Sequence, residues 1–414
     1  MASTLLILSV AGTVIALVLV RPRGWHEAWW TCAGAAILLL SRVVDLRRAM
    51  AIAASSVDAL LFLLGLLFLA ALVERSGFFG WAALGCARMA KGNGHALYRN
   101  VFLLGALVTA VLSLDSTAVM LTPIVLALVT TLRVPVRPYV FACAFVANTG
   151  SLLLPMSNLT NLLVLHGLGV SFGAFALRMV APQLLVLAAN YAAFRLWFRA
   201  ELPVRYDARA LPDPTTAVRD PSFFRSSCAV VALVCVGSFI ASAARLPPAW
   251  IALGGAGLLA GIGIAKARIG LAWLREVPLG VFPFVLGLFV IVAGVDQLGL
   301  VDRMGTWLPR GSPALAALTV AGGSAVLSNL MNNLPAALLV SRALRAAPSA
   351  LWYVLAGTNV GPCSTTFGSL ATLLVLTRAR ASGFEVRARD LLWVGLAVTP
   401  LLLLVAWGGL AMRL

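Results

Sequence analysis

The chain has 414 residues, of which 61% are hydrophobic and only 11% are charged, and its formal net charge is +17. Soluble domains carry about 25% charged residues, so the composition excludes an ordinary soluble protein and predicts a multi-pass protein of the lipid bilayer. Its 31 Lys and Arg are scattered through short loops beside apolar segments, which excludes a nucleic-acid-binding stripe and indicates topology signals instead.

Apolar segments follow one another along the chain and predict an all-α, polytopic fold with about 10–12 hydrophobic segments, because about 20 helical residues cross a hydrocarbon core. The N-terminus has no charged leader region and no small-residue cleavage site, so we expect a first membrane helix there rather than a cleaved signal peptide. The segments lie at residues 3–20, 28–41, 51–73, 101–131, 138–165, 173–198, 227–244, 249–265, 279–300, 313–341, 349–376 and 391–411.

One long polar connection, residues 199–226, divides the chain near its middle and contains five Arg. Because positively charged loops stay on the cytoplasmic side, we expect this segment in the cytoplasm and the chain in the inner (cytoplasmic) membrane. The predicted division is N-terminal membrane helices at 1–50, a first repeat at 51–198, a cytoplasmic linker at 199–226 and a second repeat at 227–414.

Four apolar segments are interrupted by polar residues, Gly and Pro. Lipid cannot hydrogen-bond an unwound backbone, so such segments must be buried in protein or line a cavity. They are "VLSLDSTAVMLTP" (111–123), "FVANTGSLLLPMSNLTNLL" (145–163), "VLSNLMNNLPAALL" (326–339) and "GTNVGPCSTTFGSLATLL" (357–374).

The four segments form two matching pairs. An offset of 211 residues places Asn359 on Asn148 and Ser369 on Asn158, and an offset of 218 places Asn333 on Asp115. The residues that follow the first broken segment, 166–176, contain no Lys or Arg, whereas four Arg follow its partner, 357–374. Because positive charges favour the cytoplasmic side, the equivalent ends of these two segments are predicted to face opposite sides of the membrane. The sequence therefore predicts two inverted repeats with a site near the bilayer midplane.

The stretches 101–132 and 313–345 are each too long for one simple span and have polar residues near the middle. We interpret both as re-entrant hairpins with two arms of about 14 residues, because such arms rise only about 21 Å. One long tilted helix in each place is the alternative. The other two interrupted segments are predicted broken transmembrane helices, and each repeat then holds one hairpin and one broken helix.

No catalytic constellation is present, and we expect a protein that is not an enzyme and needs no cofactor. The three His lie near membrane edges or in loops, and the six Cys lie mostly in apolar stretches without ligand spacing, so no metal site is predicted. The polar tips offer amides and hydroxyls, which both donate and accept hydrogen bonds. They suit a small oxygen-rich solute, an oxyanion or an alkali cation.

Two carboxyl groups within apolar segments, Asp115 and Asp58, are candidates for proton coupling. A carboxyl group in a low-dielectric interior takes up a proton more readily than in water. The alternatives are a helix N-cap for Asp115 and a cap or interface role for Asp58. Cys363 lies within "NVGPCSTTFG" and faces either the solute or the packed core.

Gly and Pro residues mark the points where the broken helices unwind, because Pro removes a backbone donor and Gly tolerates unusual dihedrals. The predicted helix-breaking residues are Gly150, Pro155, Gly361, Pro362 and Gly368.

The interrupted segments resemble the arsenite/antimonite permease (ArsB) family of the ion-transporter superfamily. The resemblance rests on "DSTAVMLTPIVLALV", "LLPMSNLTNLLVL", "NNLPAALLV" and "GTNVGPCSTTFGSLATLLVL", in that order, and covers about residues 50–410. It implies an inverted-repeat fold and export of arsenite or antimonite driven by the proton gradient, alone or together with an arsenical-pump ATPase.

The resemblance also implies which residues bind the solute, a small inorganic hydroxide. They are Asp115, Ser116, Thr117, Asn148, Ser157, Asn158, Asn161, Asn329, Asn332, Asn333, Asn359, Ser364, Thr365 and Ser369.

The family usually has Asn-Asp at the first hairpin tip, where this chain has Leu114-Asp115. Relatives in the superfamily with altered tips carry carboxylates, sulfate, or sodium and protons. The alternative functions are therefore a sodium/proton antiporter and an anion or carboxylate symporter.

Overall fold

The computed structural model describes residues 2–20, 25–265, 271–275, 277–299 and 312–412, and the regular secondary structure in these ranges is helical, with no strand. Seven helices in these ranges are long and apolar enough to cross a membrane, and five shorter apolar helices accompany them. The predicted all-α, polytopic class is confirmed.

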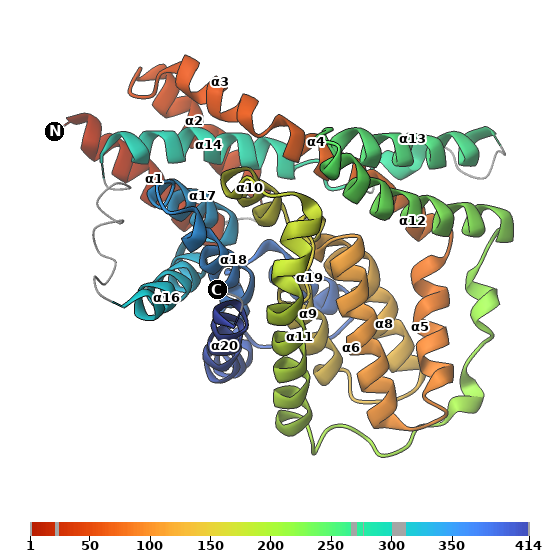
Figure 1. The fold of residues 1–414 in the computed structure, drawn as a ribbon. Coiled ribbons are helices and arrows are strands. Elements are labelled where there is room, and N and C mark those ends of the chain that lie inside the picture. Colours follow the sequence, from red (N-terminus) through yellow and green to blue (C-terminus); the bar gives the residue numbers. More distant parts are fainter. Residues whose placement is uncertain (1, 21–24, 266–270, 276, 300–311, 413–414) are drawn as a thin grey trace.

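One layer of helices runs along the upper side of Figure 1, and we call it the scaffold layer. Within it α4 packs along α13, α2 packs along α14, and α12 lies beside α13. Its members are α1 (Ala2–Val20), α2 (Glu27–Leu40), α3 (Leu46–Ser55), α4 (Val57–Arg75), α12 (Pro221–Ala243), α13 (Ala249–Ala265) and α14 (Val281–Gln297).

The remaining helices gather below this layer and are called here the site bundle (Figure 1). The long helices α11 and α20 pack against each other within it. Its members are α5 (Phe78–Met89), α6 (Gly94–Val111), α7 (Leu114–Ser116), α8 (Thr122–Thr131), α9 (Arg137–Thr149), α10 (Leu159–Leu168), α11 (Phe172–Trp197), α16 (Pro313–Met331), α17 (Asn333–Ala343), α18 (Leu351–Val360), α19 (Leu370–Ala381) and α20 (Ala388–Ala411).

Both stretches predicted as hairpins are helix pairs, but their arms differ from the expected length of about 14 residues. In the first, α6 has 18 residues; in the second, α16 has 19 residues and α17 has 11. The first hairpin starts earlier than hydropathy indicated, at Gly94, because its polar cap Asn93 lies outside the apolar stretch and accepts from the Ala96 N–H at 3.0 Å. The second starts at Pro313 as predicted, and its arms are unequal because the turn lies at Asn332.

The second arm of the first hairpin is distorted by a π-helical turn, Thr117–Leu121, between α7 and α8. Pro123 cannot donate a backbone hydrogen bond, and a wider turn ahead of it accommodates the missing donor. The Thr117 carbonyl accepts from the Thr122 N–H and also from the Thr122 hydroxyl at 2.8 Å.

Both predicted broken helices are interrupted in the structure. The first stops at Thr149 and resumes at Leu159, with Asn158 as N-cap; the second stops at Val360 and resumes at Leu370, with Ser369 as N-cap. Each interruption includes one short 3₁₀ turn. The predicted helix-breaking residues Gly150, Pro155, Gly361, Pro362 and Gly368 lie within these two interruptions.

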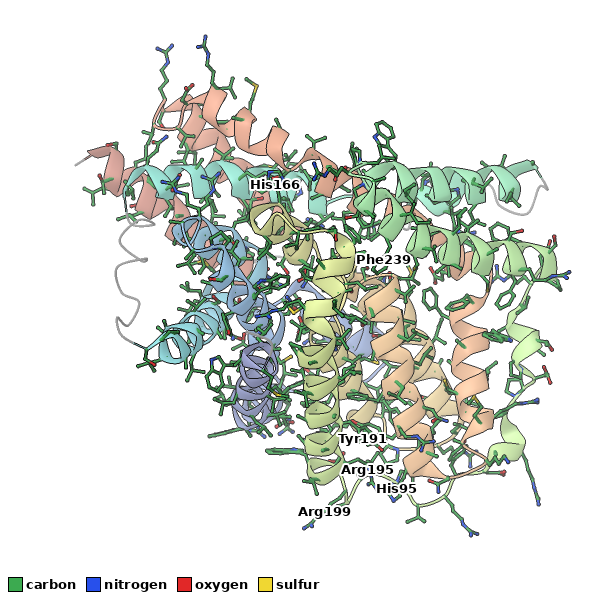
Figure 2. All side chains as sticks on the ribbon, viewed as in Figure 1. His95, His166, Tyr191, Arg195, Arg199 and Phe239 are labelled. Atoms are coloured by element: carbon green, nitrogen blue, oxygen red, sulfur yellow. The ribbon has the colours of Figure 1, made fainter. Side chains whose placement is uncertain are left out.

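The site bundle and the polar segment 199–226 meet at one end of the long helices. Arg137 at the start of α9 pairs with Glu201 at 2.7 Å. Figure 2 shows Arg195 and Arg199 near this end of α11, together with His95, whereas His166 lies at the far end. At that far end the Phe172 N–H donates to Ser242 at 2.8 Å, which joins the start of α11 to the end of α12.

Two close helix contacts in the scaffold layer depend on glycine. A Cβ on Gly65 of α4 would lie 2.6 Å from the backbone of Ala252 in α13, and one on Gly287 of α14 would lie 2.7 Å from the backbone of Thr31 in α2. Only a residue without a side chain allows backbones to approach this closely. The same kind of contact therefore fixes both of the main helix pairs of the layer.

We predict that Gly65→Ala lowers the melting temperature of the detergent-purified protein by several degrees, because overpacking costs about 1–3 kcal/mol. Gly257→Ala on α13 is the matched control, since a Cβ there meets no atom within 4 Å. Fluorescence-detected thermal unfolding of both variants gives the comparison. Equal melting temperatures would contradict the contact described.

Candidate functional site

The two helix breaks meet at the side chain of Asn359. Its Oδ1 accepts hydrogen bonds from the Ser151 hydroxyl at 2.6 Å and from Asn158 Nδ2 at 2.7 Å. Its Nδ2 donates to Asn161 Oδ1 at 2.9 Å and to the Leu355 carbonyl at 2.8 Å. All of these side chains are buried. The side-chain amide of Asn359, in the second half, thus makes all the hydrogen bonds it can make. Most of its partners lie in the helix break of the first half.

A second tie runs between the same two segments. Asn148 Nδ2 donates to the Thr372 hydroxyl at 2.8 Å and to the Ala144 carbonyl at 3.0 Å. The Ser369 hydroxyl lies 3.2 Å from that of Thr372. Asn148 Oδ1 is buried and has no hydrogen-bond partner, so this oxygen is an acceptor open to a bound solute or to water.

The unwound backbone of the first break is satisfied by two side-chain amides. Asn161 Nδ2 donates to the carbonyls of Ser151 at 2.6 Å and Leu154 at 3.0 Å. Gln183 of α11 accepts from the Leu153 N–H at 2.9 Å and donates to the Thr149 carbonyl at 2.8 Å. Sequence reasoning missed Gln183, although a lone amide in an otherwise apolar helix is a usable signal.

The break of the second half is satisfied from the second hairpin. Asn329 Nδ2 donates to the Gly361 carbonyl at 2.8 Å, and Asn329 Oδ1 accepts from the Thr365 hydroxyl at 2.8 Å. Thr365 in turn accepts from the Gly368 N–H at 3.0 Å. The Asn333 N–H donates to the Gly368 carbonyl at 2.9 Å. The hairpin tip is therefore joined to the break through backbone as well as side-chain groups.

Asn332 gives the second tip its shape. Its backbone has a φ of 78°, a value that non-glycine residues seldom adopt. Its Oδ1 accepts from the Leu334 N–H at 3.3 Å, and its Nδ2 lies 3.4 Å from the Phe367 carbonyl. The side chain of Asn332 is thus engaged in holding the turn.

The tip of the first hairpin is bound to the first break in a similar way. The Ser157 hydroxyl donates to the Ala110 carbonyl at 2.8 Å. Thr117 and Thr109 share a hydrogen bond of 2.8 Å between the two arms. Ser113 accepts from the Ser116 N–H at 3.2 Å and is the N-cap of the second arm.

Asp115 lies in the first turn after that cap, so the alternative that Asp115 is itself the N-cap does not hold. Its carboxyl group is half-buried and makes no hydrogen bond or ion pair with any residue that the structure describes. A negative charge is favoured at a helix N-terminus, yet an unpaired carboxyl group inside a membrane protein is costly. The observed surroundings therefore leave Asp115 available for a cation or a proton.

Few of the predicted site residues keep unused hydrogen-bonding groups. The side chains of Asn333 and Ser364 make no hydrogen bond within the described ranges, and Asn148 Oδ1 has no partner. We call these groups, together with the Asp115 carboxyl group, the open polar groups. The other predicted residues hold backbone or each other.

Cys363 belongs to the packed core. It is buried and its Sγ lies 3.9 Å from the Phe145 carbonyl of α9. Of the two alternatives for this thiol, the geometry favours packing.

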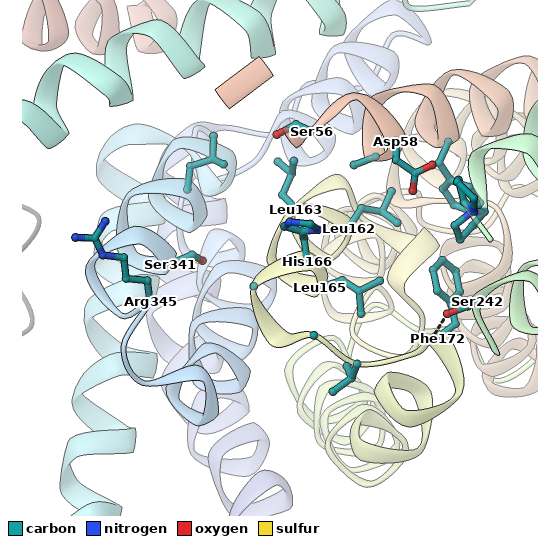
Figure 3. Close-up of a pocket in the computed structure, with 18 of the residues that line it drawn as sticks. Ser56, Asp58, Leu162, Leu163, Leu165, His166, Phe172, Ser242, Ser341 and Arg345 are labelled. Carbon is teal, nitrogen blue, oxygen red and sulfur yellow. Dashed lines mark hydrogen bonds between the residues drawn. The ribbon is translucent and has the colours of Figure 1, made fainter. Parts of the chain in front are cut away.

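Asp58 lies apart from these residues. It lines a cavity of about 930 Å³ between the scaffold layer and the helices α10 and α17, where it faces the same space as His166 (Figure 3). The sequence could not separate Asp58 from Asp115, because both are lone carboxyl groups in apolar segments.

Comparisons with known proteins agree over nearly the whole chain. Residues 5–414 match the family described as arsenical pump membrane protein (ArsB). An arsenical pump membrane protein of Escherichia coli is 31% identical over 416 residues, with 97% of this chain and 96% of the relative covered. That of Yersinia enterocolitica is 30% identical over 427 residues, with 98% and 99% covered.

Among solved structures, the chain is similar to the YdaH transporter of Alcanivorax borkumensis, whose topology is described as unusual. The TM-score is 0.59 at 15% identity, and 85% of this chain and 84% of that chain are covered. This similarity concerns the fold.

We predict that Asn359→Ala destabilises the protein by several kcal/mol, because each buried group left unsatisfied costs about 1–3 kcal/mol and the substitution leaves Asn158 Nδ2 and Asn161 Oδ1 without partners. Asn333→Ala is the matched control and should unfold close to the wild-type temperature, since its side chain makes no described hydrogen bond. Thermal unfolding in detergent distinguishes the two. A stable Asn359→Ala variant would show that the amide is not a structural centre.

Proposed function

Because the chain belongs to the arsenical pump membrane protein (ArsB) family, we propose that it exports arsenite and antimonite across the cytoplasmic membrane in exchange for protons. The observation that carries this proposal is the family match over residues 5–414, which includes all four interrupted segments. The relatives are named as pumps for arsenical compounds. Their identity of about 30% extends over the chain rather than over one motif.

The open polar groups are the proposed solute contacts. Arsenous acid is uncharged at neutral pH and presents three hydroxyl groups, which need both donors and acceptors. Asn333 and Ser364 supply both, and Asn148 Oδ1 supplies an acceptor. The residues already engaged in hydrogen bonds, such as Asn161, Asn329 and Asn359, are proposed to act by holding the breaks in shape.

Asp115 is the proposed proton-coupling residue. It is half-buried at the tip of the first hairpin and has no described partner. An uncharged solute needs no fixed counter-charge, so the carboxyl group is free to take up a proton in one state and release it in the other. This exchange would link the proton gradient to movement of the solute.

We further propose that the two halves are inverted repeats. Two contacts support this proposal, because each broken helix packs on the hairpin of the other half. Helix α10 of the first half packs on α17 of the second hairpin, and α19 of the second half packs on α8 of the first hairpin. The paired glycine contacts of α4 with α13 and of α14 with α2 extend this correspondence into the scaffold layer. Transport would then proceed by movement of the site bundle against the scaffold layer.

We predict that everted membrane vesicles containing the wild-type chain accumulate arsenite when a proton gradient is imposed and ATP is absent. Asp115→Asn should abolish the dependence on the gradient, because the amide cannot exchange a proton. Asp115→Glu, which keeps a carboxyl group at this position, is the control for folding and expression. Proton-driven uptake that survives Asp115→Asn would remove Asp115 from this role.

The same vesicles separate the alternatives. Uptake only after addition of ATP and an arsenical-pump ATPase would assign the energy source to that partner. A pH change on addition of sodium, with no arsenite uptake, would assign a sodium/proton antiporter, and uptake of a carboxylate with no arsenite uptake would assign a symporter.

A further inference from the structure

The cavity of about 930 Å³ separates the two parts of the molecule. One wall belongs to the scaffold layer and is formed by the start of α4, the α12–α13 connection and α14. The other wall belongs to the site bundle and is formed by α10 and α17. Figure 3 shows Asp58 and Ser242 on one side and His166, Leu165 and Arg345 on the other. A relative movement of the two parts must change the width of this cavity.

The cavity lies at the end of α11 opposite to the start of the 199–226 segment. Its lining includes the end of α10 and the α12–α13 connection, and Ser242 there bonds the first residue of α11. The 199–226 segment follows the other end of α11 and is predicted to be cytoplasmic. On that prediction the cavity lies on the external side of the membrane, and we call it the vestibule.

Two titratable side chains face the vestibule from opposite walls. Asp58 lies in the first turn of α4, is exposed, and accepts a hydrogen bond from the Ala249 N–H. His166 lies in the last turn of α10 and is exposed as well. Neither residue forms an ion pair within the described ranges, and both line the same cavity.

The other charged groups of the vestibule are arginines. Arg342 of α17 is paired with Asp296 of α14 at 3.0 Å. Arg345 lies on the same wall as His166, and Arg245 follows α12 on the wall of Asp58. Arginine stays protonated at every physiological pH, whereas histidine is the side-chain type that changes charge between about pH 5 and 8.

We propose that Asp58 and His166 form an external proton-binding site that draws the two walls of the vestibule together when His166 is protonated. Asp58 is the only carboxylate among the described residues that line the cavity, and His166 lines the facing wall. Protonation therefore creates an attraction across the gap at low external pH, and deprotonation removes it at high pH. The inference rests on the proposed movement of the two parts, but not on the identity of the solute.

The test uses Leu165→Cys, which places a thiol on the vestibule wall, and a membrane-impermeant thiol reagent added outside right-side-out vesicles. The unmodified chain gives the background from its own cysteines. Every thiol reacts more slowly at low pH, because the thiolate is the reactive form. At each pH the labelling rate of Leu165→Cys is therefore divided by the labelling rate of the double variant that carries Leu165→Cys and His166→Gln. We expect this ratio to fall about two- to fivefold between pH 8 and pH 5.5, the range for a partly exposed ion pair.

Two further variants in the Leu165→Cys background sharpen the result. Asp58→Asn keeps an acceptor for the Ala249 N–H and should behave as His166→Gln does, with no fall in the ratio. His166→Arg should give slow labelling at every pH, because its charge is permanent. A ratio that is constant with pH, or one that still falls in Asp58→Asn, would overturn the proposal.

Labelling does not require transport, so the two proposals fail separately. A pH-dependent ratio without arsenite uptake would support the proton site and contradict the proposed solute. Arsenite uptake with a constant ratio would support the proposed function and contradict the proton site.

Discussion

The structure depends on one constraint: backbone that leaves a helix inside a membrane protein must find hydrogen-bond partners within the protein. Two helices are interrupted at the centre of this molecule, and the freed carbonyls and N–H groups are bound by side-chain amides. Gln183 and Asn161 serve the first break, and Asn329 serves the second. These residues come from a long helix, from the broken helix itself and from a hairpin, so the constraint ties together elements that are distant in sequence.

This constraint changes how the polar residues of the centre are understood. An amide NH2 group that donates to two backbone carbonyls has no hydrogen left for a solute, and freeing one would leave a buried carbonyl unpaired. Most of the polarity in the four interrupted segments therefore maintains architecture. The smaller set of open polar groups is the part of the centre with capacity for a ligand, and it includes Asp115 at one tip and Asn333 at the other.

The sequence predicted the class of fold and the positions of both helix breaks, because Gly and Pro beside Asn and Ser have direct effects on the backbone. It could not predict which amide would bind which carbonyl, since partners such as Asn359 and Ser151 are separated by 208 residues. It also misplaced the start of the first hairpin, whose polar cap Asn93 lies outside the apolar stretch. Asp58 resembled Asp115 in its local sequence, and only the packing of α4 beside α10 placed it in a separate cavity.

The ties through Asn359 and Thr372 have a consequence for biosynthesis. Residues 145–163 enter the membrane while the second half of the chain is still being translated, and at that time Ser151, Asn158 and Asn148 lack the partners they have in the finished protein. The first half therefore matures only after residue 372 has been inserted, and the centre of the protein is completed late, by the docking of two separately inserted halves.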